Sequence, residues 1–224
     1  MLTGIIYCLS GDPIYKSYLK ASIRSLRNQG YAGPISVVTD QALNIQGVNV
    51  IPPRVYSSPK ELKVMMGFMS PYDKSLYLDC DVYAMAPFDD IWSYLDGSDL
   101  AMVLGGIQSI GGVRFGKQEE RDYTVALCGP TSPHYNSGVI LWNKTQALST
   151  FWMTWHAEWT RFSDVDELAL ARALSILNQP VVGVPSRFNF MVDARFRRPI
   201  GATLWHDASY MKYAPTLYPE LFTA

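Results

Sequence analysis

Two aspartates stand two residues apart at the end of an apolar segment. Asp79 and Asp81 flank Cys80 and follow residues 76–78, a run typical of a buried strand. Side chains at positions i and i+2 of a strand face the same way, and open α/β sheets bind ligands beyond the carboxyl ends of their strands. Neighbouring carboxylates repel each other unless a cation lies between them, so the pair favours a divalent metal completed by a diphosphate. The alternative is that both side chains simply cap the turn after the strand.

The segments around this motif predict an α/β fold. Residues 4–9 and 35–39 are short apolar runs typical of buried strands, and a helix between them is expected to begin at Asp12 and end at Gly30. A strand, a helix and a strand in this order favour a parallel sheet. A capping-box pattern begins a further helix over about 58–69. Other strands are expected at 48–51, 76–78, 100–104, 137–142, 181–184 and 203–206, and other helices at 145–161 and 163–177.

The whole chain, residues 1–224, is predicted to form one domain with a central, mostly parallel sheet flanked by helices. Residues 105–133 are rich in glycine, charged and polar side chains, and we interpret them as a long loop. Loops of this length are usually functional or mobile, so this one is a candidate for closing over one substrate or for recognising another.

Composition narrows the function and the location. The chain carries 19 basic and 20 acidic residues, whereas nucleic-acid-binding proteins usually show a basic excess, so no nucleic-acid partner is expected. Its three cysteines have no zinc-ligand spacing and are expected to be free thiols in a reducing compartment. The N-terminus lacks a signal-peptide pattern, and no apolar run reaches the roughly 20 residues that cross a bilayer. We therefore expect a cytoplasmic protein, with a homo-oligomer left open.

The segment SPYDKSLYLDCDVYAM, residues 70–85, resembles the Asp-X-Asp motif of glycosyltransferases with the GT-A fold. It is most similar to the retaining family that includes glycogenin and bacterial lipopolysaccharide galactosyltransferases. The resemblance extends over residues 5–212 and implies a Rossmann-like GT-A domain. It also implies a nucleotide-diphosphate sugar as the donor, and members of this family usually use a UDP-sugar. It also implies Mn²⁺, or alternatively Mg²⁺, bound by Asp79 and Asp81, with Asp79 and Cys80 beside the donor.

Two further segments resemble family motifs that contact the transferred sugar. YNSGVILWN, residues 135–143, implies that Asn136 contacts the sugar or the acceptor, with Ser137 beside it. DELALARAL, residues 166–174, implies that Asp166 binds sugar hydroxyls. Glu167 replaces a family glutamine at the β-face of the anomeric carbon, and a glutamate there either attacks that carbon or stabilises its positive charge. The local alternatives are a tight turn before a strand, and a helix start capped by Ser163.

The segment WHDASYMK, residues 205–212, resembles the C-terminal motif of the family. It implies that His206 is the third protein ligand of the metal and that Lys212 holds the diphosphate. An imidazole in an otherwise oxygen-rich site favours manganese over magnesium. Ser209 replaces a family glycine, so the backbone approach to the phosphate is expected to differ.

The N-terminal segment LSGDPIY resembles the loop that holds the nucleotide base. Leu9, Asp12 and Tyr15 would contact the base, although Asp12 also suits a plain helix cap. Lys63, sixteen residues before Asp79, matches a family residue that contacts donor phosphate or sugar, and Lys60 is its rival. SRFNFM, residues 186–191, is expected to shape the acceptor side.

Sugar transfer to an unidentified glycan, lipid or protein acceptor is the function these residues indicate. An inverting GT-A transferase, in which a carboxylate acts as general base, is the nearest alternative. A nucleotidylyltransferase is less consistent with the sequence, because LSGDPIY is not a glycine-rich basic phosphate loop. A non-catalytic protein that binds a nucleotide sugar on the same fold is a third interpretation, which the changes at Glu167 and Ser209 keep open.

Overall fold

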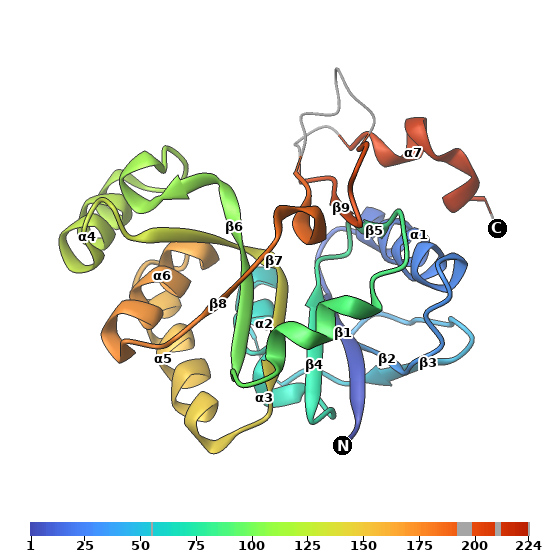
Figure 1. Cartoon of the computed structure of the whole chain (residues 1–224), viewed down its shortest axis with the longest axis horizontal. Coiled ribbons are helices and arrows are strands. Elements are labelled where there is room, and N and C mark those ends of the chain that lie inside the picture. The colour runs from blue at the N-terminus through green and yellow to red at the C-terminus, as the bar shows by residue number, and fades with distance from the viewer. Residues whose placement is uncertain (55, 192–198, 209–211, 224) are drawn as a thin grey trace.

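A seven-stranded sheet runs through the centre of the molecule, in the order β3-β2-β1-β4-β7-β6-β8 (Figure 1). The structure is a computed structural model that describes residues 1–54, 56–191, 199–208 and 212–223. The strands of this sheet are β1 (Thr3–Leu9), β2 (Ile35–Thr39), β3 (Val48–Ile51), β4 (Lys74–Leu78), β6 (Leu100–Ser109), β7 (Pro133–Asn143) and β8 (Val182–Val184). Only β7 runs antiparallel to its neighbours β4 and β6, so the sheet is mostly parallel, as predicted.

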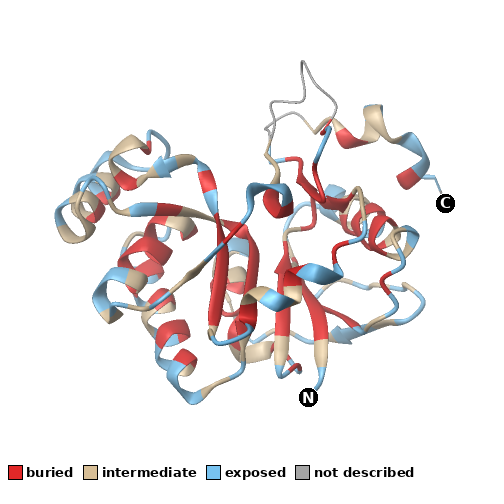
Figure 2. Cartoon of the chain, viewed as in Figure 1, coloured by how far each residue is buried: buried red, intermediate tan, exposed pale blue. Residues whose placement is uncertain are grey.

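Helices cover both faces of the sheet. They are α1 (Ile14–Asn28), α2 (Pro59–Val64), α3 (Met66–Met69), α4 (Gln118–Cys128), α5 (Gln146–Phe162), α6 (Asp166–Leu177) and α7 (Ala214–Leu217), with short 3-10 helices η1 (Asp89–Leu95), η2 (Ile110–Gly112), η3 (Ser186–Asn189) and η4 (Pro219–Leu221). Each face of the sheet packs against its own hydrophobic core, and alternate residues of β1 point into one core or the other. Ile5 packs with α1 on one face, and Ile6 packs with α2, α5 and α6 on the other. Figure 2 shows the resulting buried strands between half-exposed helices.

A small second sheet brings the C-terminal part of the chain to the Asp-X-Asp motif. Strand β5 (Val82–Ala84) directly follows Asp81 and pairs antiparallel with β9 (Leu204–His206). The register places Val82 opposite His206. Residues more than a hundred positions apart in the sequence therefore meet beside the end of β4 (Figure 1).

The prediction of a long loop at 105–133 is wrong. Strand β6 continues to Ser109, and α4 fills residues 118–128 before β7 begins at Pro133. The helix escaped detection because its packing is polar: Glu120 and Thr124 are its buried residues, and both contact the guanidinium of Arg172 in α6. Apolar periodicity, the main sequence signal for a helix, is therefore weak in this segment.

Two predicted helix boundaries also differ. The helix expected over 58–69 is interrupted at Met65, which separates α2 from α3. Ser58 does cap α2, because its hydroxyl accepts a hydrogen bond from the Glu61 N–H. Ser163 does not cap α6: it ends α5 in the left-handed conformation with φ of 51°, and Val165 precedes α6. No helix among the described residues is long and apolar enough to cross a membrane.

Candidate active site

A cavity of about 560 Å³ opens at the carboxyl ends of β1 and β4. It is lined by Cys8, Ser10, Asp12, Tyr15, Ser58, Pro59, Lys60, Lys63, Tyr77, Asp79, Cys80, Asp81, Ser163, Asp164 and Asp166. The motif and the predicted phosphate-binding lysine therefore face one space, where open α/β sheets usually bind ligands. Lys60, the rival lysine, lines the cavity too, and its ammonium binds the backbone oxygen of Asp164.

The predicted base-binding residues divide into two kinds. Asp12 and Tyr15 line the cavity, and Asp12 also caps α1 by accepting a hydrogen bond from the Ile14 N–H at 2.9 Å. Leu9 is fully buried in the core and does not line the cavity, so the structure does not bring it to the other predicted base-binding residues. Cys80 lines the cavity and is largely buried, and burial raises the pKa of its thiol well above the usual value.

Asp79, Asp81 and His206 form a cluster whose donor atoms lie within 4.8 Å of one another. His206 Nε2 is 3.4 Å from Asp81 Oδ1 and 3.7 Å from Asp79 Oδ2. A divalent ion with bonds of about 2.1 Å requires neighbouring ligand atoms to be slightly closer than this, which small side-chain rotations achieve. Two carboxylates and an imidazole fit a divalent cation.

Asn189 prepares His206 for such an ion. The amide oxygen of Asn189 lies 3.0 Å from His206 Nδ1 and can only accept, so the imidazole proton is on Nδ1. The lone pair of a neutral ring is then on Nε2, the atom that faces the two aspartates. Metal-bound histidines usually have their second nitrogen fixed in this way. Asn189 belongs to the segment 186–191, which was expected to shape the acceptor side, and no separate role was predicted for it.

Two lysines neutralise the acidic cluster. Lys212 Nζ is 2.5 Å from Asp81 Oδ2, and Lys63 Nζ lies between Asp79 Oδ2 at 2.9 Å and Asp166 Oδ2 at 3.1 Å. Burial alone would raise the pKa of Asp81, but the charges of His206 and Lys212 hold it well below its usual range. Burial would lower the pKa of Lys63, yet its two aspartate partners raise it, so its ammonium is charged. Both ammonium groups therefore lie directly beside the acidic cluster.

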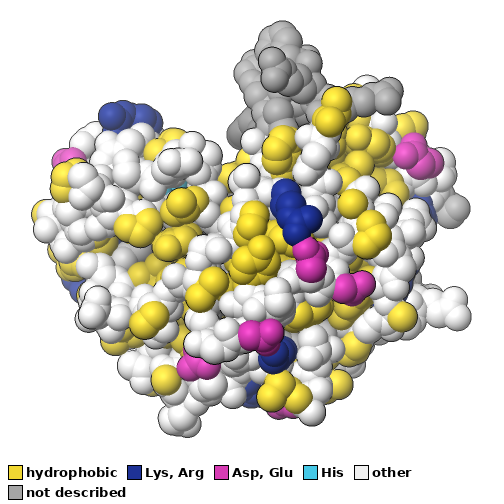
Figure 3. Space-filling model, viewed as in Figure 1, with side chains coloured by type: hydrophobic (Ala, Val, Ile, Leu, Met, Phe, Trp, Pro, Cys, Tyr) yellow, Lys and Arg dark blue, Asp and Glu magenta, His cyan; other side chains and the backbone are white. Residues whose placement is uncertain are grey.

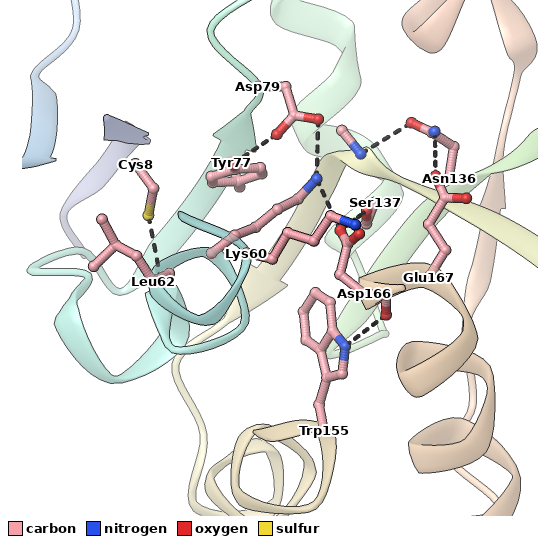
Figure 4. Close-up of polar contacts among 12 residues, drawn as sticks. Cys8, Lys60, Leu62, Tyr77, Asp79, Asn136, Ser137, Trp155, Asp166 and Glu167 are labelled. Carbon is pink, nitrogen blue, oxygen red and sulfur yellow. Dashed lines mark hydrogen bonds and ion pairs between the residues drawn. The ribbon is translucent and has the colours of Figure 1, made fainter. Parts of the chain in front are cut away.

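The sugar-contacting residues predicted on β7 and α6 also meet. Figure 4 shows Ser137, Asp166 and Glu167 below Asp79, with Asn136 beside Glu167. The Ser137 hydroxyl donates to Asp166 Oδ2 at 2.6 Å, and Asn136 Nδ2 donates to Glu167 Oε1 at 2.6 Å. Asp166 and Glu167 occupy the first turn of α6, where the helix dipole favours negative charge.

A chain of hydrogen bonds joins His206, in the Asp79–Asp81–His206 cluster, to Glu167. Asn136 Oδ1 accepts from the backbone N–H of Gly138 at 2.9 Å and from Asn189 Nδ2 at 2.7 Å. Because a backbone N–H can only donate, it fixes the orientation of the Asn136 amide, and this in turn fixes that of Asn189. The order from ligand to carboxylate is therefore His206, Asn189, Asn136 and Glu167.

His134 extends this chain and was missed by the sequence analysis. Its Nε2 lies 3.1 Å from Glu167 Oε2, and its Nδ1 lies 2.7 Å from the backbone oxygen of Ile107. The signal that could have found it is strand periodicity, because His134 and Asn136 are two residues apart on one strand. Ser209, the other departure from the family pattern, lies outside the described residues.

No family model and no curated protein matches the sequence. Solved structures do match. The galactosyltransferase LgtC, in complex with donor and acceptor sugar analogs, has a TM-score of 0.68 at 16% identity, over 98% of this chain and 95% of LgtC. The glycosyltransferase GlyE of Streptococcus pneumoniae has a TM-score of 0.67 at 16% identity, over 100% of this chain and 61% of GlyE. Mouse xyloside xylosyltransferase 1 has a TM-score of 0.57 at 11% identity, over 92% and 96%. This chain therefore has the GT-A fold of the nucleotide-sugar glycosyltransferases.

Proposed function

We propose that this protein transfers a sugar from a nucleotide-diphosphate donor, with UDP as the nucleotide, to an acceptor, with retention of the anomeric configuration and in dependence on Mn²⁺. The observation that carries the proposal is the Asp79–Asp81–His206 cluster, which adjoins a cavity and is flanked by two charged lysines. This combination suits a diphosphate that shares a cation with the protein.

The leaving group is held by the basic residues of the cavity. A divalent ion bound by Asp79, Asp81 and His206 supplies Lewis-acid stabilisation of the departing diphosphate when it is present. Lys63 and Lys212 exchange part of their contacts with the aspartates for phosphate oxygens, and they neutralise the charge that develops there. Asp12 and Tyr15, which also line the cavity, contact the base.

The sugar lies between β7 and the N-terminus of α6. Asp166 accepts hydrogen bonds from sugar hydroxyls, and Asn136 donates to the sugar or the acceptor, with Ser137 orienting Asp166 through its 2.6 Å hydrogen bond. These fixed groups hold the anomeric carbon in a geometry ready for attack.

Glu167 faces the anomeric carbon as a stabilising carboxylate in this proposal. Its two oxygens each contact a nitrogen, Asn136 Nδ2 at 2.6 Å and His134 Nε2 at 3.1 Å. Such bonds keep the carboxylate in one orientation and draw electron density from it, which suits stabilisation of an oxocarbenium-like centre more than nucleophilic attack. Trapping of a sugar covalently bound to Glu167, absent in Glu167→Ala, would instead establish the nucleophilic role.

The proposal also covers the organisation of the protein. We propose one catalytic domain that acts in the cytoplasm, and the free thiols of Cys8, Cys80 and Cys128 support a reducing compartment. On the face shown in Figure 3, acidic and basic side chains are interspersed among the coloured residues, which supports the absence of a nucleic-acid partner. The acceptor is a glycan, a lipid-linked sugar or a protein.

The test is turnover of sugar nucleotides by the purified protein. Solved structures with this fold are named for galactosyl and xylosyl transfer, so UDP-galactose and UDP-xylose are the first donors. We expect release of UDP that requires Mn²⁺ and stops with a chelator. The anomeric configuration of the product separates retention from the inverting alternative. Metal-dependent nucleotide binding without turnover of any donor would contradict the proposal and favour a non-catalytic protein.

A further inference from the structure

His134 is a buried histidine whose two ring nitrogens are both engaged. Nδ1 contacts the backbone oxygen of Ile107 in β6, and Nε2 contacts Glu167 Oε2 at the start of α6. The side chain of His134 is only 4% exposed and that of Glu167 is 14% exposed, so water competes little for this contact. The family resemblance assigns no role to this position.

The contacts determine how many protons the pair carries. The Ile107 oxygen can only accept, so Nδ1 carries a proton in every state that keeps this hydrogen bond. A neutral ring would then turn the lone pair of Nε2 toward a carboxylate oxygen of Glu167, which is repulsive. The 3.1 Å contact therefore requires one proton between Nε2 and Oε2.

The surroundings place that proton on His134. Glu167 lies in the first turn of α6, where the helix dipole stabilises a negative charge, and Asn136 Nδ2 donates to its other oxygen. An imidazolium facing a carboxylate is therefore the resting state of the pair. The ring of Phe115 covers one side of His134, with centroids 5.9 Å apart.

We propose that His134 is a positioning residue for sugar transfer: as an imidazolium, it donates to Glu167 and holds its carboxylate in one orientation at the reacting carbon. This inference rests on the proposed function, because it assumes that Glu167 faces the anomeric carbon. It gives the carboxylate at position 167 a titratable partner, which an amide at the same position would not need.

Other charges act on the pair from two elements. The charge of Asp166 on α6 interacts with His134, and the charge of Lys63 on α2 interacts with Glu167. The neighbours of His134 from β6 and from residue 115 are uncharged: the Ile107 backbone oxygen and an aromatic ring. Burial by itself would lower the pKa of His134, but the hydrogen bond and charge of Glu167 raise it above the usual value, and Asp166 raises it further. The imidazolium therefore persists to a higher pH than that of an isolated histidine.

This state predicts a specific pH dependence of turnover. Because the pKa of His134 is raised, the active pair is complete below that value and is lost as the pH rises through it. Above it, Nε2 loses its proton and Glu167 loses one of the two bonds that fix it. We expect kcat to fall on the alkaline side while KM for the donor stays nearly constant.

The chain offers matched variants for this test. His134→Gln keeps an N–H that can reach Glu167 but does not titrate, so the alkaline fall in kcat should disappear. His134→Ala removes the contact and should lower kcat by about 10- to 100-fold, the loss expected for a charge-assisted hydrogen bond at a reacting group. His156→Gln is the control, because His156 Nε2 also contacts a glutamate, Glu61 Oε1 at 2.9 Å, but outside the cavity. The profile of this control should match the wild type.

A second measurement needs no turnover. The chain has three histidines, so their ring carbon–proton signals can be assigned by single substitution and titrated by NMR with Mg²⁺ in place of paramagnetic Mn²⁺. We expect the pKa of His134 to lie above that of a model histidine and to fall in Glu167→Gln.

These results separate the inference from the proposed function. If the pKa of His134 is not lowered in Glu167→Gln, or if the alkaline fall in kcat persists in His134→Gln, the inference is wrong even though sugar transfer stands. If donors bind but no sugar is transferred, the proposed function is wrong. The NMR titration then still shows whether His134 and Glu167 form a charged pair.

Discussion

Gly138 and His206 are in such close contact that no side chain fits between them. A Cβ atom built on Gly138 would lie 2.3 Å from His206 Cε1, well inside the contact distance of two carbon atoms. The backbone of Gly138 also donates to Asn136 Oδ1 and accepts from the Asp79 N–H at 2.9 Å. One residue of β7 therefore sets the positions of the His206 ring and of the Asn136 amide, the proposed metal ligand and the proposed sugar contact.

Gly138→Ala should displace the His206 ring from the two aspartates. Because Asn189 holds the ring through Nδ1, we expect the ring to rotate about this contact rather than shift uniformly. Loss of this alignment should weaken Mn²⁺ binding by about 10- to 100-fold, the range typical when the support of a metal ligand is removed. Titration of Mn²⁺ by electron paramagnetic resonance measures this. Gly183→Ala is the control, since nothing lies within 4 Å of a Cβ at that strand position; equal affinities in the two variants would refute the argument.

Lys63→Met should destabilise the protein most when no metal is present. Lys63 Nζ bridges Asp79 and Asp166, and its removal leaves two largely buried carboxylates without that partner. Breaking a buried pair typically costs about 3–5 kcal/mol, and the cost should be at the lower end because Asp79 is partly exposed. Denaturant unfolding with a chelator and with Mn²⁺ tests this, and Mn²⁺ should recover part of the loss. Lys60→Met, whose ammonium contacts a backbone oxygen, should behave like the wild type. A similar loss in both variants would count against a special role for Lys63.

The contribution of Asp166 to stability should vanish in acid. Burial alone would raise the pKa of Asp166, but the charge of Lys63 and the hydroxyl of Ser137 lower it below its usual value. A group with a lowered pKa stabilises the fold above its unfolded value of about 3.9 and loses that effect as the pH falls through the folded value. The difference in unfolding free energy between wild type and Asp166→Asn should therefore shrink below about pH 4. Asp96→Asn, at an exposed position, should change the unfolding free energy little. A constant difference for Asp166→Asn would show that its pKa is not lowered.

The buried Arg172 should be required for α4 to stay folded. Its guanidinium is fully buried and contacts Glu120 on α4 and Glu158 on α5. Arg172→Leu leaves both carboxylates without this partner and should cost about 3–5 kcal/mol. Hydrogen exchange should then become fast over 118–128, where we expect protection in the wild type because the segment is helical. Arg161→Leu removes an exposed partner of the same Glu158 and should change little. Rapid exchange of 118–128 in the wild type would instead support the mobile loop that the sequence indicated.

Much of the fold could be predicted from the sequence, because the residues that specify each of these elements lie within the element itself. The apolar runs of β1, β2 and β4 and the cap at Ser58 each specify their own element, and all four are present. The Asp79–Asp81 pair could be placed beyond β4 for the same reason: an i and i+2 spacing after a strand is readable without knowing the rest of the fold.

The features that could not be predicted from the sequence depend on contacts between segments that are far apart in the chain. The pairing of β5 with β9 brings His206 to Asp81, and nothing near either residue specifies that register. Helix α4 is held by a buried ion pair, so its own sequence shows little apolar periodicity. His134 and Asn189 gain their roles only through partners more than fifteen positions away, which is why the sequence did not single them out.

The central claim, a nucleotide-diphosphate site that shares a metal with Asp79 and Asp81, is tested most directly by thermal stability with UDP. A ligand that binds only the folded state stabilises it by about 2.7 kcal/mol at a hundredfold excess over its dissociation constant. We predict a rise in melting temperature that requires both UDP and Mn²⁺, is lost in Asp81→Asn and persists in the exposed control Asp96→Asn. A rise that is independent of metal, or no rise with UDP and Mn²⁺ together, would contradict the account.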